Sequence, residues 1–228
     1  MTRETLDRKL QELSDEVLLL GSMVEQATLV AVRALKERDL AKSQKIYDGD
    51  KQINDLRFQL EERTITLIAT QQPMARDLRL LTSILEVITE LERMGDYAKG
   101  IGRININLGP ESRLKPPAEL IEMAETGVDM LHRALEAFVT GDEDMAREIP
   151  KDDDRVDDLF NRVQSELLAG MHDQPSEIED VNHLLWACHN LERLADRVTN
   201  ICERTLFITS GVLLEFDSTD DEARKAVS

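Results

Sequence analysis

Two glutamate–aspartate pairs in this sequence share a spacing that could bind a metal ion. Glu92 and Asp96 lie in the segment LERMGD, and Glu192 and Asp196 lie in the matching segment LERLAD. Within each pair the residues stand four positions apart, about one helical turn, so their carboxylates project from the same helix face and repel each other. The apolar residues before each pair place it at the edge of a buried face, where an unbalanced carboxylate is costly. Each pair therefore requires a cation.

Further acidic residues precede each pair on another predicted helix. The segment DKQINDL, which carries Asp50 and Asn54, matches DDRVDDL, which carries Asp153 and Asp157. Oxygen-bearing side chains that converge from two antiparallel helices favour hard cations such as Mg²⁺, Mn²⁺ or Ca²⁺, or carboxylate-bound iron. The candidate metal ligands are Asp50, Asn54, Glu92 and Asp96 in the first half and Asp153, Asp157, Glu192 and Asp196 in the second.

A salt-bridged helix surface without metal is the alternative interpretation of the same residues. The arginine after each glutamate can pair with the aspartate of its own motif, and Lys99 is also within range. The duplication of the pairs, and the acids on the neighbouring helix, favour metal over this alternative. His189 could add one nitrogen ligand in the second half or be a structural histidine. The lack of a cysteine cluster disfavours a classical structural zinc site.

Apolar residues recur every three or four positions through most of the chain, which predicts an all-α protein with six long helices. Asp39 is predicted to cap the second helix, Gly141 to end the fourth, and Ser176 to open the sixth through a capping box. Pro150 is predicted to kink or restart the chain before the fifth helix. The predicted helices span about residues 6–36, 40–71, 73–107, 118–140, 151–170 and 177–211.

The segment 108–117 is the linker of this chain that is rich in proline and glycine. Three predicted helices precede it and three follow, and the glutamate–aspartate pair lies in the third helix of each set. An internal repeat is the simplest explanation of this order. We therefore predict two tandem, similar three-helix bundles, residues 1–110 and 111–217, followed by a disordered tail, residues 218–228.

The composition excludes several classes of partner. The chain of 228 residues carries 46 acidic and 28 basic residues, a formal net charge of -18, which argues against direct binding to nucleic acid or anionic lipid. Uninterrupted apolar runs such as residues 17–20 are too short for membrane insertion, and the acidic N-terminus is unlike a signal peptide. Cys188 and Cys202 lie too far apart on one predicted helix to form a disulfide. These features predict a cytoplasmic protein.

The sequence contains no pattern typical of an enzyme. We find no paired nucleophile and base, no glycine-rich phosphate loop and no cluster of cysteine and histidine. The protein is therefore predicted not to be an enzyme. The alternative is a metal-dependent phosphohydrolase that uses the acidic clusters, because a pair of metal ions bridged by carboxylates can hydrolyse phosphate esters.

Four segments of the chain resemble the PhoU family of phosphate-uptake regulators. They are QPMARDLR at residues 72–79, LERMGD at 91–96, LLW at 184–186, and LERLADRVTNICE at 191–203, which is the most specific. The resemblance extends over residues 2–211. It implies two similar three-helix bundles and multinuclear metal clusters on the acidic motifs, with iron or zinc in some members. Manganese and magnesium remain further candidates for the metal.

The resemblance also implies a role and partners. A protein of this family is expected to be a cytoplasmic homodimer that negatively regulates phosphate uptake and phosphate-starvation signalling. Its expected partners are the ATPase subunit of the phosphate ABC transporter and a sensor histidine kinase. Ala195 departs from the family's usual glycine, found here at Gly95, but it is small enough to keep the helices close. Asn54 replaces an expected carboxylate and brings no charge, so the second half is expected to hold metal more tightly.

Overall fold

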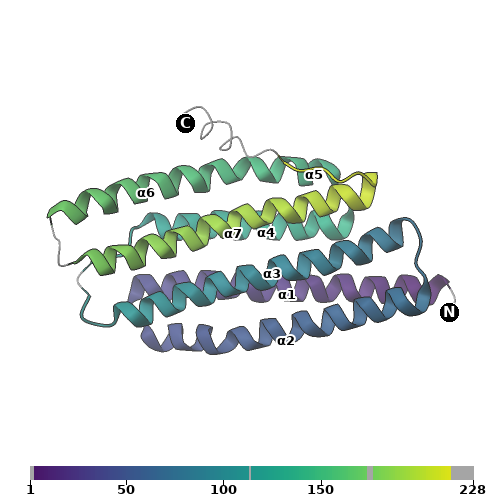
Figure 1. Ribbon diagram of the computed structural model, residues 1–228, viewed down its shortest axis with the longest axis horizontal. Coiled ribbons are helices and arrows are strands. Elements are labelled where there is room, and N and C mark those ends of the chain that lie inside the picture. Colours follow the sequence, from purple (N-terminus) through teal and green to yellow (C-terminus); the bar gives the residue numbers. More distant parts are fainter. Residues whose placement is uncertain (1–2, 113, 174–176, 217–228) are drawn as a thin grey trace.

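The computed structural model describes residues 3–112, 114–173 and 177–216, and the chain within these ranges is helical and without strands (Figure 1). A short helix, α5 (Glu143–Glu148), and a 3₁₀ turn, η1 (Ile149–Asp152), connect the fourth and fifth long helices. The prediction of an all-α fold with six long helices is confirmed. These helices are α1 (Arg3–Glu37), α2 (Leu40–Gln71), α3 (Arg76–Leu108), α4 (Glu119–Thr140), α6 (Asp153–Asp173) and α7 (Ile178–Ser210).

Local capping residues set several helix ends at their predicted positions. The Asp39 side chain accepts a hydrogen bond from the backbone amide of Lys42, at 2.9 Å, at the start of α2. Gly141 follows α4 with a φ of 73°, in the left-handed region that favours glycine. Pro150 lies in the 3₁₀ turn immediately before α6, which is the predicted restart.

One predicted helix start differs from the structure, and the capping residue predicted for another is not described. Helix α3 begins at Arg76 and not at Pro73, because Gln72 and Ala75 have φ values of 49° and 48°, which no α-helix tolerates. The capping residue predicted for the last helix, Ser176, lies outside the described residues. The residue that precedes α7 is Glu177, and its side chain makes no capping hydrogen bond.

The helices are arranged so that α2 and α6 lie on opposite outer sides of the molecule. Figure 1 shows α2 along one side and α6 along the other, with α1, α3, α4 and α7 between them. The two halves of the chain meet where α3 packs against α7 and α1 against α4. Helices α3 and α7 are antiparallel, since Arg79 near the start of α3 donates from Nε to the carbonyl oxygen of Ile208 near the end of α7, at 3.1 Å. The α2–α3 contact and the α6–α7 contact therefore lie on opposite sides of the interface between α3 and α7.

One hydrophobic core includes residues from both halves of the chain. It contains Val17 of α1, Leu91 of α3, Leu135 of α4 and Leu191 of α7, all almost completely buried. Burial of one such apolar side chain stabilises a fold by roughly 1.5–3 kcal/mol. The division into bundles near residue 110 stays a prediction, and each predicted bundle contributes to the same core.

Helix α1 is the one helix among the described residues with the length and apolar composition to cross a membrane. Its apolar residues are used inside this fold, where Val17, Leu20 and Val24 are fully buried. A core helix of a bundle meets the same criteria of length and composition. The short uninterrupted runs in the sequence understate how apolar this helix is, because its apolar residues are spaced along one face.

Candidate metal centre

The two glutamate–aspartate pairs occupy equivalent places on α3 and α7. Residues 91–100 and 191–200 have the same succession of buried, half-buried and exposed side chains. In each copy the glutamate is half-buried and the aspartate is exposed. Each pair therefore begins at the edge of the buried face, as the apolar periodicity predicts, and the two copies can be compared residue by residue.

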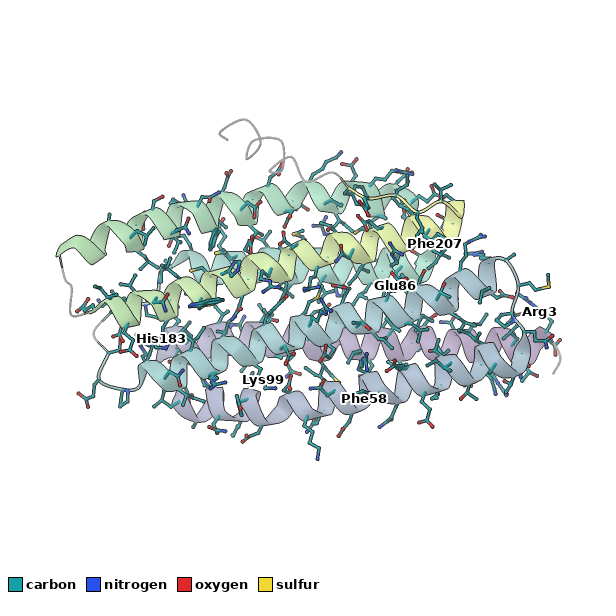
Figure 2. All side chains as sticks on the ribbon, in the orientation of Figure 1. Arg3, Phe58, Glu86, Lys99, His183 and Phe207 are labelled. Carbon is teal, nitrogen blue, oxygen red and sulfur yellow. The ribbon has the colours of Figure 1, made fainter. Side chains whose placement is uncertain are left out.

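The first acidic face consists of Asp50 and Asn54 on α2 with Glu92 and Asp96 on α3. Asp50 is only 5% exposed, and its Oδ2 atom accepts two hydrogen bonds. One comes from the Lys99 ammonium at 2.7 Å and the other from Asn54 Nδ2 at 2.8 Å. Figure 2 labels Lys99 on the side of α3 that faces α2, and the same ammonium lies 3.5 Å from Asp96 Oδ1. A side chain of the protein thus supplies the cation of this face.

A second positive charge acts on the first acidic face. Burial raises the pKa of Glu92, and the neighbouring charge of Asp96 adds to the rise, whereas the guanidinium of Arg57 opposes it. Arg57 lies on α2 one turn beyond Asn54 and donates from Nη1 to Glu61 Oε2 at 2.6 Å. The acids of this face therefore lie among cations that come from both of its helices.

The second acidic face consists of Asp153 and Asp157 on α6 with Glu192 and Asp196 on α7. Burial raises the pKa of Asp153 to about 8, and the negative charges of the other three acids of the face add to the rise. Asp153 Oδ1 is buried and has no hydrogen-bond partner among the described residues. The structure therefore brings the other three predicted acids of the second half close enough to Asp153 to disfavour its negative charge.

His189 lies beside the second acidic face and contacts one of its acids. Its Nδ1 atom is 3.0 Å from Glu192 Oε2, and burial together with the charge of Arg193 lowers the pKa of the imidazole. The ring centroid of His189 lies 6.0 Å from that of Phe160 and 5.8 Å from that of Trp186. An imidazole held neutral by these surroundings contributes little positive charge to the face at pH 7.

The residues at equivalent positions explain the electrostatic difference between the two faces. Where the first acidic face has Asn54, the second has Asp157. Where the first has Lys99, one turn after the aspartate of the pair, the second has Thr199, whose hydroxyl donates to the backbone carbonyl of Asp196 at 2.6 Å. Phe160 takes the place of Arg57. The second face therefore has one more acid and lacks the two cations that act on the first.

The second acidic face has the donor chemistry that a hard cation requires. It supplies four carboxylates, the ligands preferred by Mg²⁺, Mn²⁺ and carboxylate-bound iron, and Asp153 Oδ1 is buried without a hydrogen-bond donor among the described residues. Within the described ranges no three or more histidine, cysteine, aspartate or glutamate side chains are gathered in a geometry ready to hold an ion. The ligand set Asp153, Asp157, Glu192 and Asp196 stays a prediction, and a metal ion would draw these side chains together.

The first acidic face fits a metal ion poorly. The Lys99 ammonium lies beside Asp50 and Asp96, where a cation bound by both helices would lie. Asn54 directs its amide nitrogen to Asp50, because an ionised carboxylate can only accept hydrogen bonds. An amide nitrogen that donates a hydrogen bond cannot also be a metal ligand. The predicted ligand set Asp50, Asn54, Glu92 and Asp96 also stays a prediction, and these contacts favour the salt-bridged alternative for it.

Two residues that matter for the faces are absent from the predicted ligand sets. The sequence places Lys99 within reach of Asp96 on its own helix, but the contact with Asp50 depends on how α2 and α3 pack. The position of Arg57 in the sequence does not by itself indicate a role. The signal that could have identified both is the alignment of the two halves, which sets Lys99 against Thr199 and Arg57 against Phe160.

Comparison with protein families matches this chain twice. The PhoU domain matches residues 17–104 and again residues 120–205. Each match includes one acidic face, and the two together cover most of the six long helices. The internal repeat inferred from the glutamate–aspartate pairs thus coincides with two copies of one family domain.

Relatives and solved structures are similar over nearly the whole chain. A phosphate-specific transport system accessory protein PhoU homolog from Clostridium acetobutylicum is 35% identical over 212 residues, which are 92% of this chain and 97% of the relative. The crystal structure of the phosphate transport system regulatory protein PhoU from Streptococcus pneumoniae aligns with a TM-score of 0.86 at 31% identity, over 92% of this chain and 100% of that one. The crystal structure of PhoU from Pseudomonas aeruginosa aligns with a TM-score of 0.85 at 31% identity, over 90% and 99%.

Proposed function

The chain belongs to the PhoU family, and we propose on that basis that it is an accessory protein that regulates a phosphate transport system. The observation that carries this proposal is the match of both halves to the PhoU domain together with agreement in fold over nearly the full length. A fold alone would support many functions. Here the relatives that share the fold also share about a third of the sequence and a role in phosphate transport in their names.

The finer part of the proposal concerns direction and partners. We propose a negative regulator of phosphate uptake and phosphate-starvation signalling that works in the cytoplasm as a homodimer. It would bind the ATPase subunit of the phosphate ABC transporter and a sensor histidine kinase. The net charge of -18 supports docking to basic surfaces of such partners, because opposite charges speed encounter and suppress wrong partners.

We also propose that the second acidic face binds a metal ion. Asp153, Asp157, Glu192 and Asp196 would hold it, and the ion would neutralise carboxylates that otherwise repel one another. Four oxygen donors suit iron, manganese or magnesium, and zinc is the further candidate. The role proposed for the ion is structural, since it would fix α6 against α7 at the outer side of the bundle.

A binding experiment tests the regulatory proposal. The purified protein is titrated with the purified ATPase subunit of the phosphate ABC transporter, and in parallel with the cytoplasmic part of the sensor kinase. The ATPase subunit of an unrelated sugar transporter serves as the control. We expect saturable binding to the two phosphate-system partners that weakens as salt is added. Equal binding to all three proteins, or binding to none, would contradict the proposal.

An enzymatic assay separates the regulator from the phosphohydrolase alternative. The protein is loaded with Mn²⁺, Fe²⁺, Zn²⁺ or Mg²⁺ and assayed with p-nitrophenyl phosphate. We expect the same background rate from the wild type, from Glu192→Ala and from Asp196→Ala. Turnover that is present in the wild type and lost in both variants would identify a metal-dependent hydrolase.

A further inference from the structure

The ammonium group of Lys99 reaches from α3 to the most buried acid of α2. We propose that Lys99 is a built-in cation that replaces the metal ion in the first half of the chain. The first acidic face is then complete without metal, and the protein holds metal on the second acidic face alone. This inference rests on the metal site proposed for the second face.

The contacts of Lys99 place it where a bound ion would have to lie. Its Nζ atom is 2.7 Å from Asp50 Oδ2 on α2 and 3.5 Å from Asp96 Oδ1 on α3, so it bridges the acids of the two helices. Asp50 is 5% exposed and needs a compensating charge, because a buried carboxylate without one is strongly destabilising. An ammonium and a metal ion at the same place would repel each other, so occupation by Lys99 excludes the ion.

Asn54 makes the same face less suitable for metal from the α2 side. It donates from Nδ2 to the same Asp50 oxygen, at 2.8 Å, and also lies 3.2 Å from the Asp50 carbonyl oxygen. Asp50 Oδ2 therefore already accepts two hydrogen bonds from side chains. Asp50 Oδ1 is buried with no hydrogen-bond partner among the described residues, as is Asp153 Oδ1. The two faces therefore do not differ in this unpartnered Oδ1 atom. They differ because Asp50 Oδ2 accepts hydrogen bonds from Lys99 and Asn54.

The equivalent positions of the second half lack this arrangement. Thr199 stands in place of Lys99, and its hydroxyl is directed to the backbone of α7. Asp157 stands in place of Asn54 and adds a negative charge to the face instead of a hydrogen-bond donor. Two substitutions in each half therefore exchange these two pairs of residues, while Arg57 and Phe160 stay in place.

Two double variants test this exchange. Asn54→Asp with Lys99→Thr gives the first acidic face the residues that the second has at positions 157 and 199, and Asp157→Asn with Thr199→Lys does the reverse. The matched control is Lys151→Thr, which removes a lysine that is 66% exposed and paired with Glu148 on the surface. Each purified protein is loaded with Mn²⁺ and, separately, with Fe²⁺, and freed of unbound ion. Metal per chain is then measured by mass spectrometry, and melting temperature is measured with and without EDTA.

The expected results are opposite for the two double variants. Asn54→Asp with Lys99→Thr should double the metal content of the wild type and make the melting temperature more sensitive to EDTA. Asp157→Asn with Thr199→Lys should lose the metal of the wild type and melt at the same temperature with and without EDTA. Lys151→Thr should keep the metal content of the wild type. The reverse variant does not alter the first half, so it remains informative if the loss of Lys99 prevents folding.

The failure of this inference can be told apart from failure of the proposed metal site. If the wild type binds metal and Asn54→Asp with Lys99→Thr folds but gains none, Lys99 is not what excludes the ion and the inference is overturned. If the wild type binds none, the proposed site on the second face is wrong. In that case a gain of metal in Asn54→Asp with Lys99→Thr would still support the role of Lys99, and no gain would overturn it.

Discussion

The first and second acidic faces have the same arrangement of helices and differ in the charged side chains around their acids. Both consist of an acid-bearing helix packed on a helix with a glutamate–aspartate pair, and the burial of residues 91–100 and 191–200 follows the same succession. In the first face Lys99 contacts Asp50 and Arg57 acts on Glu92. In the second face Thr199 and Phe160 stand at those positions, and four acids act on one another. The repeat thus preserves the acidic positions, whereas the cations that the protein itself supplies are found at the first face.

Removal of the internal cation should have the largest effect on stability. Lys99→Met leaves the buried Asp50 with the hydrogen bond from Asn54 but without its charged partner. We expect a loss of about 3 kcal/mol in the free energy of unfolding, which is at the low end for a buried ion pair because Lys99 is 30% exposed. Urea denaturation followed by circular dichroism measures it. Lys151→Met, which breaks the surface pair with Glu148, should cost no more than about 0.5 kcal/mol. Equal losses in the two variants would mean that Lys99 does not stabilise the first face.

Removal of metal should destabilise the second half only. A ligand at 100 times its dissociation constant stabilises the folded state by about 2.7 kcal/mol, so chelation of the wild type should remove roughly that amount. Asp153→Asn should abolish the effect of EDTA, because burial and three neighbouring acids disfavour the charge of Asp153, which the metal would neutralise. Asp50→Asn is the matched change in the first face and should leave the sensitivity to EDTA intact. An EDTA effect that disappears in Asp50→Asn instead would reverse the assignment.

The stability of the metal-free protein should depend on pH through the second acidic face. The folded pKa of Asp153 is about 8, above the ordinary value of 3.8, so between these values the folded state keeps a proton that the unfolded state releases. Stability should therefore fall as pH rises through this window, by at most about 1.4 kcal/mol per pH unit. Melting temperatures in EDTA from pH 5 to 8 measure the slope. Asp153→Asn should flatten it, and a slope that is unchanged in this variant would contradict the assignment.

Exchange of the histidine beside the second face should have the smallest effect. His189→Thr introduces the residue found at the equivalent position of the first half, Thr89, and removes the contact with Glu192. We expect a stability change below about 1 kcal/mol, typical for a half-exposed side chain, and no change in metal per chain. Loss of bound metal in His189→Thr would identify the imidazole as a ligand and sharpen the difference between the faces.

The parts of the fold that depend on local sequence could be predicted, and the parts that depend on helix packing could not. Asp39 and Gly141 mark helix ends through contacts within a few residues, so their roles can be inferred from the chain alone. The start of α3 could not, since the turn around Pro73 depends on positive φ values at Gln72 and Ala75 that neither residue type predicts.

The same limit applies to the candidate site. The spacing of Glu92 and Asp96 predicts that they share a helix face, and alignment with the second half adds the acids of the neighbouring helix. Lys99 can contact an acid of its own helix or Asp50 of α2, and the rotation of α3 against α2 decides between them. The spacing of apolar residues does not define this rotation accurately enough to predict the contact. The contrast between Lys99 and Thr199 is visible in the sequence, but its meaning requires the distance to Asp50.

The most direct test of the difference between the two faces compares matched losses of their acidic pairs. Glu92→Gln with Asp96→Asn neutralises the pair of the first face, and Glu192→Gln with Asp196→Asn neutralises the equivalent pair of the second. Metal per chain is measured for both and for the wild type after identical loading with Mn²⁺. We predict that the first variant retains the metal content of the wild type and that the second loses it. Equal loss in both variants would show that both faces bind metal and would contradict the role assigned to Lys99.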